Sequence, residues 1–182
     1  MTTQTWNIDT THSGVNFSVR HMVIAKVRGR FTRFSGTLTG DAADLTKATL
    51  VAEVDADSID TNMADRDAHL RSPDFFDAAS FPKLSFSSTR IERLGDGQYK
   101  AHGDLSIRGV TKPVVFDLTI HGQAKDPWGN ERVAFTLESA VDRSEFGLRW
   151  NQALETGGVL VGERVAIEIE AEAVRAAAAQ AA

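Results

Sequence analysis

The sequence contains no cysteine and only four prolines among its 182 residues. Without cysteine there is no disulfide, no thiolate metal site, no iron–sulfur cluster and no cysteine nucleophile. The chain also lacks any run of about 18 consecutive apolar residues, so no transmembrane helix is predicted. Basic residues are not in excess, because 20 Lys and Arg against 25 Asp and Glu give a net charge of −5. Binding to the nucleic-acid backbone is therefore not expected as the main function.

The first residues, Met1 to Trp6, lack the basic and apolar regions of a secretion signal. We therefore expect a cytoplasmic protein that does not insert into membranes. The apolar share of 42% and the charged share of 25% are typical of soluble globular proteins.

Apolar and polar residues alternate through most of the chain, as in antiparallel strands with one buried and one solvated face. This pattern predicts strands near 5–9, 14–24, 27–38, 48–58, 83–93, 98–107, 113–124, 131–142 and 159–173. Gly95-Asp96-Gly97 predicts a hairpin between two of them. Long consecutive antiparallel strands favour an all-β closed barrel, because closure removes exposed sheet edges. We expect one domain over residues 5–174, followed by a frayed or disordered alanine-rich tail at 175–182.

Residues 61–81 interrupt the alternating pattern. Asn62 is a candidate helix N-cap, and Ser72-Pro73 is a second helix start signal. The sequence therefore predicts short helices at about 62–70 and 73–77, inserted between strands where they can cap a barrel mouth. Residues 143–158 show no clear period but contain several large apolar side chains. They either cover apolar surface or include another strand.

Two groups of polar residues are candidates for function. Arg66, Asp67 and His69 form the densest polar cluster. They can act as an acid–base pair or as a clamp on a ligand head group, or they can serve only capping and surface pairing. His21 shares the inward face of Phe17 and Val19. It is therefore either a hydrogen-bonded core histidine or a polar contact inside a cavity.

The sequence supplies no motif for a cofactor. It lacks a P-loop, a dinucleotide-binding glycine motif, a nucleophile elbow and a His-Glu-x-x-His zinc motif. No pair of histidines has metal-ligand spacing, so no metal is predicted. The ten phenylalanines either fill the barrel or line a space for one ligand, and periodicity leaves both alternatives open.

A series of short motifs resembles the YceI-like family of lipocalin-like polyisoprenoid-binding proteins. The motifs are His12-Ser13-x-Val15-x-Phe17-x-Val19-x-His21, Arg66-Asp67-x-His69-Leu70, Asp74-Phe75-Phe76-Asp77, Phe81-Pro82, Leu105-x-Ile107-Arg108-Gly109-Val110-Thr111-Lys112-Pro113 and Phe146-Gly147-Leu148. Their order and spacing extend the resemblance from about Trp6 to Val174.

The resemblance implies an eight-stranded antiparallel lipocalin-like barrel with a short helical insertion near residues 62–77. It implies a tunnel for a long isoprenoid or quinone-like lipid, for carriage, storage or sequestration, and it implies that a homodimer can form. The expected ligand-binding residues are Phe17, Val19, His21, Phe31, Arg66, Asp67, His69, Phe75, Phe76, Phe86, Leu105, Phe135, Phe146 and Trp150. Among these, His21, Arg66, Asp67 and His69 are the candidates for a polar head group.

Two alternatives stay open. The first is a sequestering binder of other amphiphiles, such as fatty acids, fatty amides or lipophilic antibiotics. The second is an enzyme that acts on a similar lipid with Asp67 and His69 as acid and base. The main expectation is a binding protein without catalytic residues or cofactor.

Overall fold

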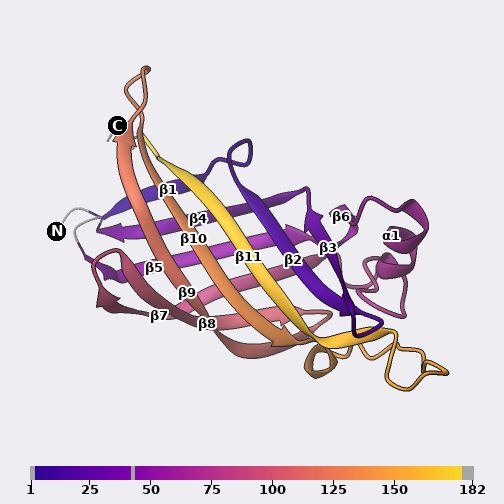
Figure 1. Ribbon diagram of the computed structural model, residues 1–182. Helices are drawn as coiled ribbons and strands as arrows, with labels where there is room; N and C mark the ends of the chain where they lie inside the picture. The colour runs from indigo at the N-terminus through magenta and orange to yellow at the C-terminus, as the bar shows by residue number, and fades with distance from the viewer. Residues whose placement is uncertain (1–2, 42–43, 178–182) are drawn as a thin grey trace.

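The computed structural model describes residues 3–41 and 44–177. Eight antiparallel strands form a closed ring in the order β1, β4, β5, β7, β8, β9, β10 and β11, and β11 pairs back to β1 (Figure 1). The bounds of the ring strands are β1 Gln4–Ile8, β4 Phe34–Asp41, β5 Asp44–Asp55, β7 Lys83–Gly95, β8 Gln98–Ile107, β9 Val110–Lys125, β10 Glu131–Asp142 and β11 Val161–Arg175. The predicted all-β, eight-stranded barrel is confirmed.

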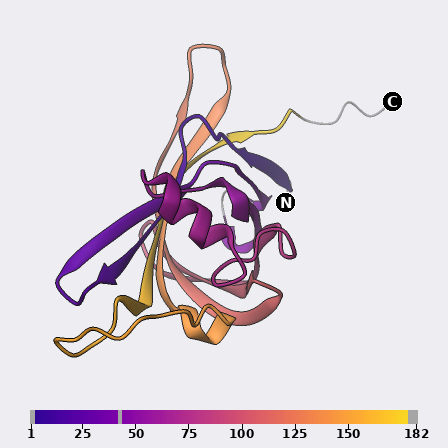
Figure 2. The ribbon, with the colours of Figure 1, turned by 90° about the vertical axis from the view of Figure 1, so that its right-hand side faces the viewer.

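Strand β11 pairs with two different strands along one edge. Its last residues, Ala173–Arg175, pair with β1, whereas Val161–Glu170 pair with β2 (Gly14–His21). Strand β2 continues into β3 (Ala25–Phe31), and the β2–β3 hairpin leaves the ring and projects from one end (Figures 1 and 2). Strand β3 is held at its end by the short strand β6 (Ile59–Asp60). The barrel is therefore closed at the β1 end of β11 and splayed at the β2 end.

The insertion between β5 and β7 lies across the splayed end of the barrel (Figure 2). It contains the short 3-10 helix η1 (Ala56–Ser58), β6 and the helix α1 (Ala64–Arg71). The predicted first helix is thus confirmed with slightly shifted bounds, but its N-cap is Met63 and not Asn62. Asn62 instead has a φ of 60°, a left-handed conformation in the turn before the helix.

Three further predictions were wrong in detail. The second helix at 73–77 does not form, because Ser72 O accepts from two different amides, of Phe75 and Asp77, and the segment folds as turns. The strand predicted at 27–38 is two strands, because Thr32 N and Arg33 N bond to Ser58 and draw the backbone out of the sheet. Strand β11 includes Arg175, the first residue of the predicted tail. Residues 178–182 of that tail lie outside the described residues.

Residues 143–158 cover apolar surface, one of the two predicted alternatives. They begin with the 3-10 helix η2 (Arg143–Phe146), and Phe146 and Leu148 are buried in the core. No helix of the described residues is long and apolar enough to span a membrane.

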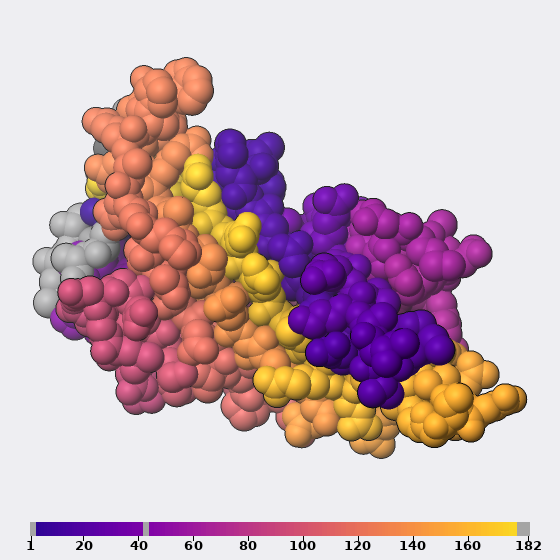
Figure 3. Space-filling model, viewed as in Figure 1, coloured from indigo at the N-terminus to yellow at the C-terminus, as the bar shows by residue number. Residues whose placement is uncertain are grey.

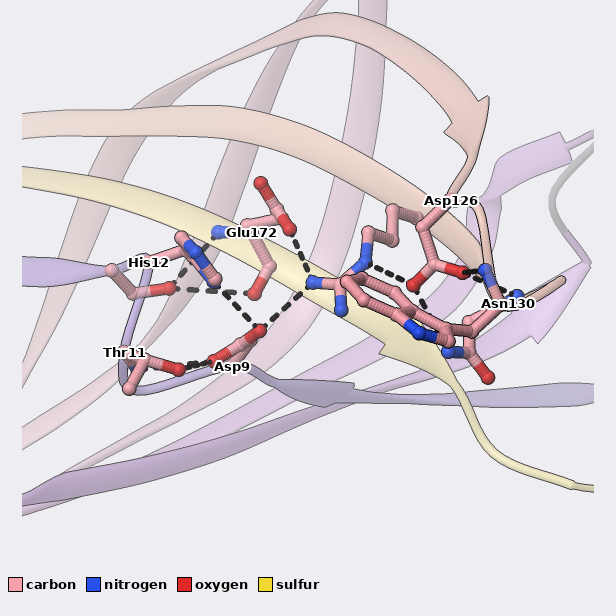
Figure 4. Close-up of polar contacts among 9 residues, drawn as sticks. Asp9, Thr11, His12, Asp126, Asn130 and Glu172 are labelled. Atoms are coloured by element: carbon pink, nitrogen blue, oxygen red, sulfur yellow. Dashed lines mark hydrogen bonds and ion pairs between the residues drawn. The ribbon is translucent and has the colours of Figure 1, made fainter.

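Side chains reinforce the closure between β1 and β11 (Figure 4). The Arg132 guanidinium donates to Asp9 just after β1, to Asp126 in the β9–β10 turn and to Glu172 in β11. One cation on β10 therefore links three segments at the closed end of the barrel.

Two carboxylates of this cluster, Asp9 and Asp126, are held in their ionised form. Hydrogen bonds from Thr11, His12 and Arg132 hold the pKa of Asp9 well below its usual range. Burial alone would raise the pKa of Asp126, but hydrogen bonds from Asn130, Arg132 and the backbone lower it well below its usual range. Because these folded-state pKa values are depressed, their stabilising contribution is present above the unfolded-state pKa of about 4 and is lost as the pH falls below it.

We expect Arg132→Gln to lower the melting temperature at pH 7, because it leaves Asp9 and Glu172 close together without their cation. The difference from the wild type should shrink as the pH falls from 5 to 3, because the carboxylates of the unfolded chain take up protons there while Asp9 of the folded wild type stays ionised. Thermal unfolding across this pH range measures the effect. Arg93→Gln is the control, because its partner Asp96 is fully exposed and screened by solvent. A loss that is the same at pH 7 and pH 3 would contradict the electrostatic account.

Candidate ligand-binding site

The barrel encloses an apolar cavity of about 200 Å³. Nine of the ten phenylalanines line it, and Phe81 is the exception. The other apolar lining residues come from β1, β5, β7, β8, β10 and β11 of the ring and from β2, α1 and the loops: Ile8, Val15, Val19, Leu50, Ala52, Val54, Leu70, Leu84, Leu105, Ile107, Leu137, Val141, Leu148, Val161, Val165, Ile167, Ile169 and Ala171. The polar lining residues are Asn16, Ser35, Ser85 and Arg143.

Two glycines leave room for the aromatic rings of the wall. Gly29 faces Phe17 across the β2–β3 pair, and a Cβ there would lie 2.3 Å from the Phe17 ring. Gly103 in β8 is not directly opposite Phe86, but a Cβ there would lie 2.5 Å from the Phe86 ring and 2.4 Å from Ser87 O. Because a side chain at either position would displace the ring, these glycines set where Phe17 and Phe86 stand in the cavity wall.

Nine of the fourteen expected ligand-binding residues line this cavity: Phe17, Val19, Phe31, Phe75, Phe76, Phe86, Leu105, Phe135 and Phe146. The five others, His21, Arg66, Asp67, His69 and Trp150, lie outside the lining. The structure thus brings together the apolar members of the set, while most of the polar ones are placed elsewhere.

Arg66 and Asp67 bind the same residue of the insertion. The Asp67 carboxylate accepts from Thr61 N at 2.9 Å and from the Thr61 hydroxyl. Arg66 donates to the Thr61 hydroxyl and to Thr61 O, each at 2.7 Å. Asp67 and Thr61 are both buried. This geometry fixes the turn before α1. It is not a helix cap, because the N-cap of α1 is Met63 and no side-chain hydrogen bond caps it.

His69 and Trp150 belong to an aromatic cluster at the splayed end. The His69 ring packs edge-to-face on Trp150 and on Phe75, with centroids 4.6 and 5.1 Å apart. Its Nε2 lies 2.8 Å from a carboxylate oxygen of Asp74. Because Phe75 also lines the cavity, His69 and Trp150 lie directly behind the cavity wall. The partners of His69 and Asp67 are different, so these two side chains do not form a mutual acid–base pair in this structure.

His21 ends strand β2 and pairs with Val161, which lines the cavity. Its side chain is partly exposed, whereas Val19 on the same face belongs to the lining. His21 therefore lies at the end of the wall, beside the tip of the projecting hairpin.

Arg143 is the functional candidate that the sequence reasoning missed. Its side chain is buried and donates to four backbone carbonyls, those of Leu148, Trp150, Val161 and Gly162. Its guanidinium carbon lies 5.9 Å from the centre of the Phe75 ring. Burial lowers the pKa of Arg143. No sequence pattern distinguishes Arg143, since a single arginine after an apolar strand is common in loops.

Most of the other missed lining residues carried a signal in the period-two pattern. Ile167 and Ile169 alternate with glutamates in β11, and Leu137 follows Phe135 by two residues in β10. The same parity that placed Phe135 inside therefore identifies these neighbours.

The cavity wall offers hydrocarbon contact and little else. Among the described residues, the lining contains no carboxylate, imidazole or amine. Three groups elsewhere, Asp9, His12 and Glu172, offer ligand atoms within 4.8 Å of one another. Arg132 already donates to both carboxylates of that group, so a cation occupies the position that a metal would need. The arrangement suits binding of an apolar molecule.

A model of the YceI-like domain matches residues 6–173 of the chain. A UPF0312 protein of Staphylococcus epidermidis is 38% identical over 168 residues, covering 92% of this chain and 95% of that protein. A UPF0312 protein of Vibrio cholerae is 38% identical over 138 residues, covering 76% of this chain and 73% of that protein.

Solved structures show the same barrel. A Campylobacter jejuni YCEI protein is 30% identical with a TM-score of 0.76, covering 87% of this chain and 90% of that one. Burkholderia cenocepacia BcnA is similar in fold, with a TM-score of 0.80, 22% identity and coverage of 91% and 98%. A polyisoprenoid binding domain from Saccharophagus degradans has a TM-score of 0.71, 14% identity and coverage of 94% and 98%.

Asp67→Ala is expected to lower the free energy of unfolding by about 1–3 kcal/mol, because it leaves Thr61 N and its hydroxyl buried without their acceptor. Asp67→Asn keeps one oxygen in place and should lose less. Denaturant unfolding measures both values. Loss of ligand capture in Asp67→Asn at unchanged stability would instead place Asp67 among the ligand contacts.

Arg143→Met keeps the length of the side chain but removes all donors to the four carbonyls. We expect a loss of about 2–3 kcal/mol in the free energy of unfolding, from buried acceptors left unpaired. The stability of Arg143→Lys should lie between those of Arg143→Met and the wild type, because the lysine ammonium keeps the positive charge but lacks the planar set of donors of a guanidinium. Equal stability of Arg143→Met and wild type would contradict this role.

Proposed function

Because the chain belongs to the YceI-like family, we propose that it binds the hydrocarbon chain of a long isoprenoid or quinone-like lipid inside the barrel, for carriage, storage or sequestration. The observation that carries the proposal is the cavity wall, which nine phenylalanines line together with aliphatic side chains. Transfer of a hydrocarbon chain from water into such a space is favourable by about 0.8 kcal/mol for each buried methylene.

A structural neighbour supports the choice of ligand class. The Saccharophagus degradans domain with the same fold is named as a polyisoprenoid binding domain. Its identity to this chain is low, so the support concerns the kind of cavity and not individual contacts. An isoprenoid chain is branched and apolar along its whole length, which suits a wall of rings and branched aliphatic side chains.

The head group of the lipid is proposed to lie at the splayed end of the barrel. The cavity interior has few polar residues, so a polar group has little to bind there. His69 packs on the cavity residue Phe75 and remains partly exposed, whereas Arg66 and Asp67 are engaged with Thr61. Of the four polar residues expected from the sequence, His69 and His21 therefore fit head-group contact best.

A broader ligand range is the second candidate. A wall that offers hydrocarbon contact selects for apolar bulk and shape more than for a particular head group. This observation favours fatty acids, fatty amides or lipophilic antibiotics as competing ligands. Catalysis is not proposed, because Asp67 and His69 have separate partners and the described lining residues include no acid–base group.

Mass spectrometry of an organic extract, beside native mass spectrometry of the intact protein, identifies the ligand. We expect one polyprenyl or quinone species at stoichiometric amounts. A mixture of fatty acids would favour the broad binder, and a cavity that carries no lipid after purification and after incubation with polyprenyl lipids would overturn both.

Val19→Trp should lower lipid occupancy at least tenfold, because the indole would fill part of the cavity. Val115→Trp on the exposed side of β9 makes the same change outside and should leave occupancy unchanged. Circular dichroism of both variants checks that the barrel still folds. Equal occupancy in the two variants would contradict binding in this cavity.

A further inference from the structure

We propose that the β2–β3 hairpin docks the protein on an anionic lipid bilayer, with the mouth of the cavity turned toward the membrane. The hairpin tip carries exposed apolar side chains, and the strands behind it carry basic ones that form no ion pair within the described part of the chain. Docking would give the ligand a route from the membrane into the cavity. Only this purpose of the docking surface rests on the proposed lipid-binding function.

The tip exposes several apolar side chains. Met22, Val23 and Ile24 form the turn, and the exposed fractions of Val23 and Ile24 are 65% and 82%. Val159 of the neighbouring loop is also exposed. Met22 N donates to Leu160 O at 2.9 Å, and Val23 lies against Gly158, so the hairpin and the loop form one surface. We call these four residues, Met22, Val23, Ile24 and Val159, the apolar tip.

The backbone conformation of the tip does not explain why its residues are apolar. Met22 and Val23 have φ angles of 51° and 67°, in the left-handed region that disfavours a β-branched residue. Asn or Gly would suit this turn better. The apolar side chains therefore need a reason other than turn formation, and contact with a hydrocarbon layer supplies one.

The strands behind the tip are strongly basic in an acidic protein. Residues 13–40 contain five Lys and Arg and no Asp or Glu, whereas the whole chain has a net charge of −5. Arg30 and Arg33 form ion pairs with Asp60 and with Asp55 and Asp57. For the other three, Arg20, Lys26 and Arg28, the described part of the chain shows no ion pair, and all three are exposed.

These three basic residues lie on one face of the hairpin. Arg20 and Lys26 are directly opposite each other across the strand pair, and Arg28 follows Lys26 by two residues. Figure 3 shows the hairpin and the loop with Val159 gathered at one corner of the molecule. An apolar tip with basic residues behind it matches the chemistry of an anionic membrane surface, where side chains enter the interface and cations meet lipid phosphates.

The cavity wall reaches the same corner. Val19 lies three residues before Met22, and Val161 is paired with His21. Both line the cavity. A bilayer that contacts the apolar tip would therefore lie next to the wall along which a lipid chain enters. Two properties of the hairpin, its apolar turn and its basic residues, point to one occupant.

The test is co-sedimentation of the full chain with vesicles of phosphatidylcholine and phosphatidylglycerol, compared with vesicles of phosphatidylcholine alone. We expect binding to the anionic vesicles that weakens as salt rises. Each basic residue close to an anionic surface strengthens binding about fivefold, so the triple variant Arg20→Gln, Lys26→Gln, Arg28→Gln should bind about a hundredfold more weakly. The control variant Arg93→Gln, Lys100→Gln, Lys125→Gln removes the same charge at the other end of the barrel and should bind like the wild type.

A second variant tests the apolar tip. Met22→Ser, Val23→Asn, Ile24→Ser removes the apolar surface and places at position 23 a residue that tolerates the turn. It should bind anionic vesicles at least tenfold more weakly without losing thermal stability. Trp128→Ser, which removes an exposed ring from the β9–β10 turn, is the control. Loss of binding in Trp128→Ser and not in the tip variant would overturn the proposal.

The outcomes separate docking from ligand binding. A wild-type protein that carries lipid in its cavity but does not bind anionic vesicles overturns the docking surface and leaves the proposed function standing. A protein that binds vesicles through the tip, with a cavity that never takes up lipid, supports docking and overturns the proposed function. Binding to heparin without binding to vesicles would assign the basic face to another polyanion and overturn the membrane proposal.

Discussion

The edge of β11 is the constraint on which the whole arrangement depends. Its backbone amides and carbonyls need partners along fifteen residues, and β1 supplies them only for Ala173–Arg175. Strand β2 pairs with Val161 and with Val165–Glu170, and it diverges from the ring to do so. Between the two strands, Asp9 N and Ser13 Oγ bond to the backbone of Glu172. This division gives the barrel one tightly closed end, reinforced by Arg132, and one splayed end that has to be covered by other parts of the chain.

The cover of the splayed end is held by cations that bind backbone carbonyls. Arg71 donates to Asp57 O and Ile59 O, and Arg108 donates to Phe75 O and Gly147 O. Arg143 donates to two carbonyls of the loop before β11 and to two at the start of β11. A backbone carbonyl in a turn has no hydrogen-bond partner in a β-sheet. A single guanidinium has five N–H donors, so it can bind several such carbonyls at once. The segments around the cavity end are thus positioned by guanidinium groups that bind backbone carbonyls, and one of these arginines, Arg143, also lines the cavity.

The sequence predicted the barrel because alternation with period two is a direct consequence of strand geometry. The same alternation put Phe17 and Phe135, which line the cavity, on an inward face. The contacts of the polar candidates could not be predicted in this way. Arg66 and Asp67 are adjacent to apolar motifs in the chain, yet their partner is Thr61, a contact set by how the turn before α1 closes. Arg143 was missed for the same reason, since its carbonyl partners are brought together by the packing of the loop before β11 against the start of that strand. Side-chain direction in strands follows from the sequence pattern, whereas loop contacts follow from tertiary packing.

The divergence of β3 from the ring also bears on how two copies of the chain can meet. Strand β3 pairs with β6 only at Arg30 and Phe31, so the backbone of Ala25–Gly29 is an exposed sheet edge among the described residues. Antiparallel pairing of two copies along this edge would bring Lys26, Arg28 and Arg30 of one copy close to the same residues of the other. Like charges at facing positions oppose such pairing. The edge that the barrel leaves open is therefore protected against self-assembly by its own side chains, and a homodimer would have to use another face.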